Sequence, residues 1–157
     1  IDLARREGVR LVLIAPMVCG VATLVSLKRE FGDMMFIAHP SLGGLRIAPQ
    51  ALFGKLFRLF GADAMIFPNY GGRFSYPREV CQAIARHNTQ AWHELHSTLP
   101  TPAGGMSVER AGEIVREYGR DSMLLIGGAL LAEHEQLAAR STEFVNAVAA
   151  AAEAVTA

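Results

Sequence analysis

The chain has 157 residues, of which 51% are hydrophobic and 19% are charged, so a disordered chain is excluded and a sizeable core is expected. Fifteen Lys and Arg residues balance fifteen Asp and Glu residues, which argues against a basic surface, and no nucleic-acid partner is expected. Cys19 and Cys81 are too few for a disulfide framework or a zinc cage, so a reducing cytoplasm is the predicted compartment.

The first predicted strand, Val9–Ala15, lies within the most apolar stretch of the chain, residues 9–25. A charge, a proline and a glycine interrupt this stretch, which leaves it short of a membrane span, and no membrane partner is expected. The residues before it resemble the end of a helix, and the chain opens with Ile1 rather than Met. We therefore expect a fragment of a longer protein.

One pattern recurs along the rest of the chain: a helical segment ends in glycine, and an apolar run follows directly. Each glycine is expected to end its helix in the left-handed conformation that a Cβ disfavours. These glycines are Gly8, Gly32, Gly61 and Gly119, which lie 24, 29 and 58 residues apart. Because 58 is twice 29, a further unit is expected near residue 90, where Asn88 is a residue type that tolerates the same cap conformation. The predicted strands are Val9–Ala15, Met34–Ala38, Ala64–Phe67, Leu99–Pro102 and Ser122–Ile126.

Amphipathic helices are predicted between these strands. Leu52–Phe60 carries apolar residues at three- and four-residue steps, Pro77 suits the first turn of a helix, and Ser107 is expected to cap another. An alanine-rich helix, Leu131–Ala154, closes the chain. The strands are continuously apolar, which is typical of parallel strands buried on both faces.

About five β-α units therefore form an α/β fold, for which two architectures remain. One is a complete doubly wound domain, a binding or signalling module without catalysis. The other is the C-terminal part of a (β/α)8 TIM barrel, which needs roughly 250 residues in all. The start inside a helix and the placement of the glycines favour the barrel fragment.

Paired glycines follow the last two predicted strands, where parallel α/β folds gather their functional residues. Gly104 and Gly105 follow one strand, and Gly127 and Gly128 follow the next. Exposed backbone N–H groups at such junctions cradle phosphate, although glycine pairs also serve simple tight turns. Because two pairs lie at adjacent strand ends, a phosphate-binding site and simple tight turns are both retained as hypotheses.

Two side chains at strand ends are candidates for chemistry. His39 ends the second predicted strand, where a histidine acts as acid, base or phosphate ligand, or is a hydrogen-bonded structural residue. Arg73 ends a glycine-containing loop after the third strand and is either a cation for a developing oxyanion or a solvated arginine. Cys19 has no activating partner, and no Asp/Glu cluster for a metal follows any strand.

Five motifs in this order resemble the RuBisCO large-subunit superfamily, and best its non-carboxylating branch, the RuBisCO-like (form IV) proteins. They are residues 38–44 (AHPSLGG), 52–63 (LFGKLFRLFGAD), 67–74 (FPNYGGRF), 100–106 (PTPAGGM) and 124–128 (LLIGG). The resemblance implies that residues 1–157 are a partial TIM-barrel catalytic domain, strands four to eight. An N-terminal α+β domain and the first barrel strands would then lie outside the chain.

The resemblance also implies a chemistry and site residues. Family members enolise a ketose phosphate through an enediolate that Mg²⁺ stabilises, with metal ligands on strand two, which is outside this chain. Gly105, Gly127 and Gly128 match the phosphate-binding glycines, and His39 matches the strand-five histidine. Family members form dimers in which the N-terminal domain completes the neighbouring site, so a homodimer is expected and the chain alone should be inactive.

Departures from the carboxylating members shape the expected function. Pro40 replaces their second-phosphate arginine, and Arg73 replaces the loop lysine that supports carboxylation. Ala103 and Ala129 replace a serine and a glycine of the phosphate motifs. We therefore expect an enolase, isomerase or decarboxylase acting on a ketose monophosphate without fixing CO2. A non-catalytic phosphate-binding scaffold and a ribulose-bisphosphate carboxylase are the alternatives.

The loop between the third strand and the next helix is expected to shape the pocket away from the phosphate. Asn69 and Tyr70 in this loop are therefore predicted to line the substrate pocket.

Overall fold

The computed structural model describes residues 1–44, 46–74 and 76–155. Its four strands are β1 (Leu11–Ile14), β2 (Met35–Ala38), β3 (Ala64–Pro68) and β4 (Leu99–Ala103). The helices before β3 are α1 (Asp2–Arg6), α2 (Pro16–Cys19), α3 (Val21–Glu30), α4 (Pro49–Ala51), the π-helical η1 (Leu52–Leu56) and α5 (Phe57–Leu59). The later helices are α6 (Arg78–Thr89), α7 (Ala111–Tyr118), α8 (Gly128–Leu131), the 3-10 helix η2 (His134–Gln136) and α9 (Leu137–Ala154).

The strands are all parallel and lie in consecutive order, β1-β2-β3-β4. A fifth segment joins the edge of β4 through a single parallel bridge between Ala103 and Leu125. Consecutive order is that of a barrel wall, whereas a doubly wound sheet reverses its order at a switch point. The predicted parallel α/β fold is confirmed, and the doubly wound alternative is wrong for the described strands.

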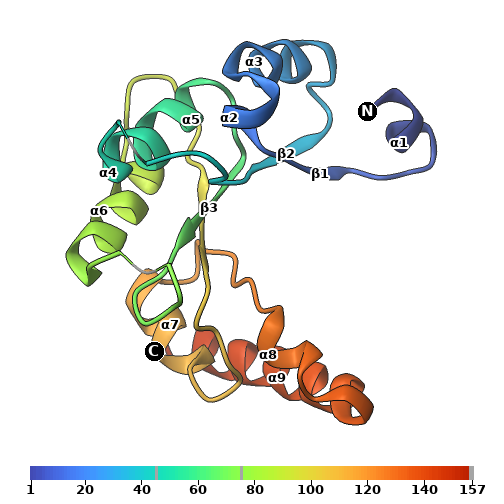
Figure 1. Ribbon diagram of the computed structural model, residues 1–157, viewed down its shortest axis with the longest axis vertical. Helices are drawn as coiled ribbons and strands as arrows, with labels where there is room; N and C mark the ends of the chain where they lie inside the picture. Colours follow the sequence, from blue (N-terminus) through green and yellow to red (C-terminus); the bar gives the residue numbers. More distant parts are fainter. Residues whose placement is uncertain (45, 75, 156–157) are drawn as a thin grey trace.

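One face of the sheet is covered by helices and holds the main core (Figure 1). Side chains alternate along a strand, so Phe36 and Ala38 of β2 point to the same face as Met65 and Phe67 of β3. These side chains are buried against helices η1, α5 and α6. A second cluster joins α7 to α9 through Met106, Val108, Ala111, Ile114 and Phe144.

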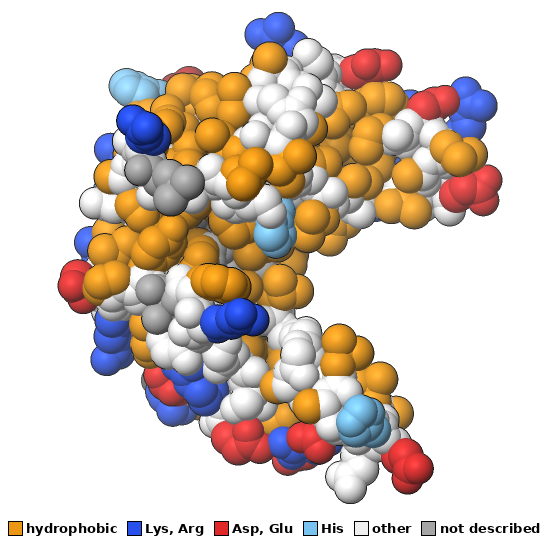
Figure 2. Space-filling view, viewed as in Figure 1, with side chains coloured by type: hydrophobic (Ala, Val, Ile, Leu, Met, Phe, Trp, Pro, Cys, Tyr) orange, Lys and Arg blue, Asp and Glu red, His pale blue; other side chains and the backbone are white. Residues whose placement is uncertain are grey.

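The other face of the sheet is concave and partly open, which gives the molecule the crescent outline seen in Figure 2. Leu11 and Leu13 of β1 and Met35 of β2 lie on this face, and Leu13 is 51% exposed. The prediction that the strands are buried on both faces is therefore wrong for β1 and β2. The described helices pack against only one side of these strands, so the inward-facing side chains have no cover.

Three local expectations differ from the structure. The predicted strand Ser122–Ile126 forms only the bridge at Leu125. Gly8, Gly61 and Gly119 adopt positive φ as predicted, but Gly32 does not, because Phe31 already ends α3. Helix α6 ends at Thr89, as expected for a unit near residue 90, but Asn88 lies in its last turn and Gln90 is the cap.

The predicted helices are largely present with shifted ends. Leu52–Phe60 is part of a continuous helical stretch through α4, η1 and α5, and its π-helical turn brings Gly54 against His87 of α6. The cap of α7 is Arg110 rather than Ser107. No helix among the described residues is long and apolar enough to cross a membrane.

Candidate functional site

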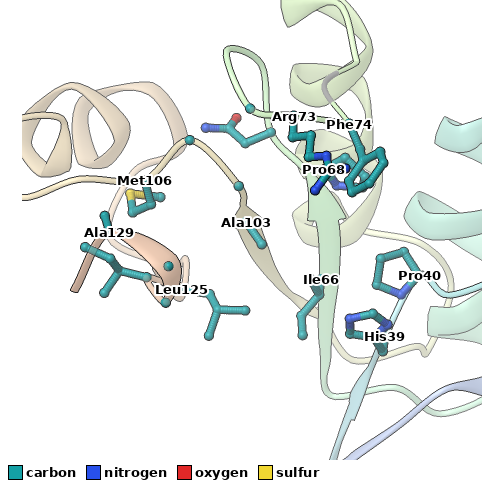
Figure 3. A pocket seen from close by; sticks show the side chains of 17 residues that line it. His39, Pro40, Ile66, Pro68, Arg73, Phe74, Ala103, Met106, Leu125 and Ala129 are labelled. Carbon is teal, nitrogen blue, oxygen red and sulfur yellow. The ribbon is translucent and has the colours of Figure 1, made fainter. Parts of the chain in front are cut away.

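A cleft of about 700 Å³ lies at the carboxyl ends of the strands (Figure 3). Segments that follow β2, β3, β4 and the bridged segment each contribute to it, as expected for a parallel α/β fold. Figure 3 shows His39 and Pro40 on one side, with Met106, Leu125 and Ala129 on the other. The lining residues that sequence analysis proposed are His39, Asn69, Arg73, Gly104, Gly105, Gly127 and Gly128.

His39 follows β2 and is held by its own turn. Its Nδ1 atom lies 2.7 Å from Ser41 Oγ and accepts a hydrogen bond of 3.2 Å from the backbone N–H of Ser41. A nitrogen that accepts from a backbone N–H carries a lone pair, so the proton of the neutral ring is on Nε2. The ring therefore carries a hydrogen-bond donor on the nitrogen that Ser41 leaves free.

Asn69 is fully buried at the end of β3 and lines the cleft. Its backbone N–H donates to Ala103 of β4 at 2.8 Å, and its Oδ1 accepts a 2.6 Å hydrogen bond from the hydroxyl of Tyr118. Its Nδ2 atom has no hydrogen-bond partner among the described residues. A buried amide donor without a partner lowers the stability of the folded protein, so its presence beside the cleft needs an explanation.

Two glycine pairs meet backbone to backbone beside the cleft. A Cβ on Gly105 would lie 2.6 Å from the carbonyl oxygen of Gly71, and one on Gly72 would lie 2.8 Å from the carbonyl carbon of Gly104. Both Gly71 and Gly105 have positive φ, at 77° and 64°. Arg110 holds this contact from outside, since its Nη1 donates to the carbonyl of Gly105 at 2.8 Å. Only glycine allows the two loops this approach.

Gly127 and Gly128 are open instead of packed. Both are exposed, and an added Cβ at either would meet no heavy atom within 4 Å among the described residues. Gly127 precedes α8, and its carbonyl accepts hydrogen bonds from Leu130 and Leu131. The cleft therefore has bare backbone on the side of these glycines.

Arg73 lies at the rim of the cleft, exposed, with its guanidinium carbon 5.2 Å from the ring centroid of Phe74 (Figure 3). It is the one Lys or Arg side chain among the described lining residues. Pro40 also lines the cleft and brings no charge there.

Tyr70 does not line the cleft, unlike its neighbour Asn69. Its ring packs between the guanidinium groups of Arg78 and Arg110, at 5.4 and 5.3 Å, and its hydroxyl donates to Glu113 at 2.7 Å. Burial and the hydrogen bond to Glu113 raise the pKa of Tyr70 to about 12. The side chains of both Asn69 and Tyr70 contact α7, through Tyr118 and Glu113 respectively, but only Asn69 lines the cleft.

The described residues contain no cluster of three His, Cys, Asp or Glu side chains that would hold a metal ion. Cys19 is exposed on α2, and Cys81 is buried in α6, where burial raises the pKa of its thiol. Sequence analysis missed two residues that support the site, Arg110 at the N-cap of α7 and Tyr118 at its last position, because both act from behind the cleft. Ser41, two residues after His39, was detectable as a local turn partner.

Comparison with known proteins gives close relatives over nearly the whole chain. Ribulose bisphosphate carboxylase-like protein 1 of Rhodopseudomonas palustris is 49% identical over 150 residues, which are 95% of this chain and 41% of that protein. 5-Methylthioribulose-1-phosphate isomerase of Rhodospirillum rubrum is 52% identical over 147 residues, which are 93% of this chain and 39% of that protein. The chain belongs to the RuBisCO-like proteins. The resemblance proposed from its motifs is thus confirmed.

A solved RuBisCO-like structure from Rhodopseudomonas palustris agrees with this assignment. It superposes with a TM-score of 0.85 at 42% identity and covers 94% of this chain and 40% of its own. No protein-family model matches the chain. The chain thus spans about two-fifths of the length of the RuBisCO-like relatives that it matches.

Proposed function

We propose that the full-length protein isomerises a ketose monophosphate of the 5-methylthioribulose 1-phosphate type. The observation that carries the proposal is the cleft itself, which places open glycine backbone and the polar residues His39 and Asn69 at the carboxyl ends of successive strands. The relative that is 52% identical and named 5-methylthioribulose-1-phosphate isomerase supports this substrate class. Isomerisation moves a proton from a carbon beside the carbonyl and returns it elsewhere, so it needs no co-reactant.

In this proposal the glycine loops bind the phosphate group. Backbone N–H groups of Gly104, Gly105, Gly127 and Gly128 donate hydrogen bonds to the phosphate oxygens. A nest of such N–H groups attracts a negatively charged ligand. His39 donates from Nε2 to an oxygen of the sugar, since Ser41 holds the other ring nitrogen. The group that removes the proton lies outside this chain.

Magnesium does not fit the described residues as a complete site. The lining offers the imidazole of His39 but no carboxylate, whereas magnesium prefers several oxygen ligands. We propose that its ligands come from the first barrel strands, outside residues 1–157, and no step of the reaction is assigned to it here. The same proposal places an N-terminal α+β domain before this part of the barrel.

A ribulose-bisphosphate carboxylase is the second candidate, and the charge of the lining argues against it. Two phosphates need two sets of cationic or N–H partners. Among the described residues the lining has one Lys or Arg, Arg73, and at the position after His39 it has Pro40. A substrate with one phosphate matches this lining better.

The proposal is tested by comparing two glycine variants of the full-length protein. Gly105→Ala should abolish measurable phosphate binding and lower kcat/KM at least 100-fold, because the methyl group would lie 2.6 Å from the Gly71 carbonyl and displace the loop. Gly119→Ala is the matched control, since Gly119 also has positive φ but lies at the end of α7, away from the cleft. Calorimetric titration with inorganic phosphate and turnover of 5-methylthioribulose 1-phosphate are the measurements.

The outcomes separate the alternatives. An enzyme loses turnover with Gly105→Ala and keeps it with Gly119→Ala. If the unmodified protein binds phosphate but turns over no ketose phosphate, the non-catalytic scaffold is favoured. If it does not bind phosphate, the proposal is wrong. We also propose a cytoplasmic homodimer, for which light scattering of the full-length protein gives the mass.

A further inference from the structure

The guanidinium of Arg110 contacts the segments that follow two neighbouring strands. Its Nη1 donates to the carbonyl oxygen of Gly105, after β4, at 2.8 Å. A Cβ on Gly71, after β3, would lie 3.1 Å from the same nitrogen. Arg110 is not among the described residues that line the cleft, whereas Gly105 is. The Gly105 carbonyl is therefore directed to a group outside the lining.

Glu113 and Tyr70 hold this guanidinium in place. Both carboxylate oxygens of Glu113 accept from Arg110, at 3.2 Å from Nε and 3.3 Å from Nη2, which leaves Nη1 for Gly105. The ring centroid of Tyr70 lies 5.3 Å from the guanidinium carbon, and the Tyr70 hydroxyl donates to Glu113 at 2.7 Å. Two-point pairing with a carboxylate fixes the plane and direction of a guanidinium. Arg110 is thus oriented without help from any ligand.

The Gly105 peptide group benefits from such an anchor. Gly105 has a φ of 64°, and a residue without a Cβ allows its peptide groups many orientations. A carbonyl oxygen only accepts hydrogen bonds, as phosphate oxygens do, so a Gly105 carbonyl turned into the cleft would repel a phosphate bound at the glycines. A hydrogen bond from a charged donor is stronger than one from a neutral donor. Arg110 therefore selects the orientation in which this oxygen faces away from the lining.

We propose that Arg110 is a positioning residue for the phosphate site, which holds the Gly105 carbonyl away from the ligand and is itself oriented by Glu113. The inference rests on the proposed function, in which glycine backbone binds the substrate phosphate. Arg110 makes no contact with the ligand, and its charge is paired with Glu113. Losing Arg110 should therefore weaken binding of the phosphate group and leave the chemical step intact.

The test uses Arg110→Met in the full-length protein, because methionine keeps an unbranched apolar stem and has no N–H donor. Calorimetric titration gives the Kd for inorganic phosphate, and turnover of 5-methylthioribulose 1-phosphate gives KM and kcat. We expect Kd and KM to rise together, roughly tenfold, with kcat within about twofold, as for loss of uniform binding. A merely structural arginine would instead lower the folded fraction, which reduces the apparent kcat and leaves Kd and KM unchanged.

Arg78→Met is the matched control. The guanidinium carbon of Arg78 lies 5.4 Å from the ring centroid of Tyr70, and its ion pair is with Glu117. Among the described residues Arg78 makes no hydrogen bond to either glycine loop. The two variants therefore lose the same kinds of contact, a cation–π contact and an ion pair, and only Arg110→Met loses the bond to Gly105. Arg78→Met should leave the Kd for phosphate and KM unchanged.

Glu113→Gln tests how Arg110 is oriented. The amide has the shape of the carboxylate but only one acceptor oxygen and no charge, so the two-point pairing is lost. We expect the Kd for phosphate to rise roughly threefold in this variant. In the double variant Arg110→Met/Glu113→Gln no further rise beyond that of Arg110→Met is expected, because Glu113 acts only through Arg110. Independent, multiplying effects would contradict this role of Glu113.

The outcomes separate this inference from the proposed function. An unchanged Kd for phosphate in Arg110→Met, or an equal rise in Arg78→Met, would overturn the inference while the proposed function stands. If Arg110→Met does not fold, Glu113→Gln decides, and an unchanged Kd for phosphate there would overturn the inference. Failure of the unmodified protein to bind phosphate would overturn the proposed function and this inference together.

Discussion

Arg58 is a buried cation that holds the connection between α6 and β4. The residue is only 4% exposed, and its guanidinium donates to four backbone carbonyls, at distances of 2.7 to 2.9 Å. The acceptors are His87, Gln90, Leu95 and His96. A planar fork of donors matches several carbonyls at once, which an ammonium group does not. The loop is thus shaped by a side chain remote from it in sequence.

Replacing Arg58 should be among the most damaging changes outside the cleft. Arg58→Leu would leave buried carbonyls without partners, so we expect a loss of about 3–5 kcal/mol in the free energy of unfolding. Urea denaturation measures it as a lower midpoint. Arg29→Leu, at an exposed position of α3, is the control and should change stability by no more than about 0.5 kcal/mol. Equal effects of the two would contradict the role given to Arg58.

Helices α6 and α7 are joined by a carboxylate at their contact. Glu117 of α7 pairs with Arg78 and accepts a 2.6 Å hydrogen bond from Gln82, and its side chain is only 6% exposed. The hydrogen bond from Arg78 lowers the pKa of Glu117, and the bond from Gln82 acts in the same direction. The two helices therefore depend on the ionised form of this group.

Acid should weaken this contact. A carboxylate with a lowered pKa in the folded protein contributes its stability above the unfolded value of about 4.3 and loses it as pH falls through the folded value. We expect Glu117→Gln to cost stability at pH 7 and to reduce the further loss between pH 5 and pH 3. Thermal unfolding at several pH values measures this, with Glu135→Gln, exposed in η2, as control. An identical acid response in Glu117→Gln would refute the assignment.

Most helices and strands could be predicted from the sequence, but the residues at which they begin and end could not. Apolar runs after glycines placed all four strands, because a buried strand and a left-handed cap are both local requirements. The segment around Leu125 was predicted as a full strand but forms one bridge, since pairing on its outer edge depends on neighbours that no local pattern encodes. The helix end expected near residue 90 is present, but Asn88 lies in the last turn instead of at the cap, because residue type alone does not tell these two positions apart.

For the cleft, too, some residues could be predicted from the local sequence and others depend on distant packing. His39, Asn69 and the glycine pairs were recognisable because strand ends in parallel folds meet at one edge. Tyr70 was assigned to the cleft, and the structure turns it toward Arg78 and Arg110. The orientation of a loop side chain depends on packing against distant helices, which spacing does not reveal.

At the scale of the whole molecule, the concave face determines how the isolated chain behaves. Leu11, Leu13 and Met35 are between 38% and 51% exposed there, and the strand register puts Leu99 and Leu125, at 38% and 42%, on the same face. An apolar area of this kind is unusual on a monomer and favours association.

Residues 1–157 produced alone should therefore bind a hydrophobic dye such as ANS and self-associate. Leu13→Glu combined with Met35→Lys should reduce dye binding at least twofold, because both side chains are exposed on this face. Fluorescence titration and light scattering measure the effect. Val145→Lys, on the exposed side of α9, is the control and should change neither signal. A monomer without dye binding would contradict this account.

Because Gly71–Gly72 and Gly104–Gly105 touch through their main chains, the two loops cannot be engineered one at a time. Grafting residues 68–74 from another member of the superfamily would bring in a path shaped to a different counterpart and create a steric clash at the glycine contact. Chimaeras that change substrate preference should exchange both segments together. The same reasoning makes an insertion in either segment acceptable only with a compensating change in the other.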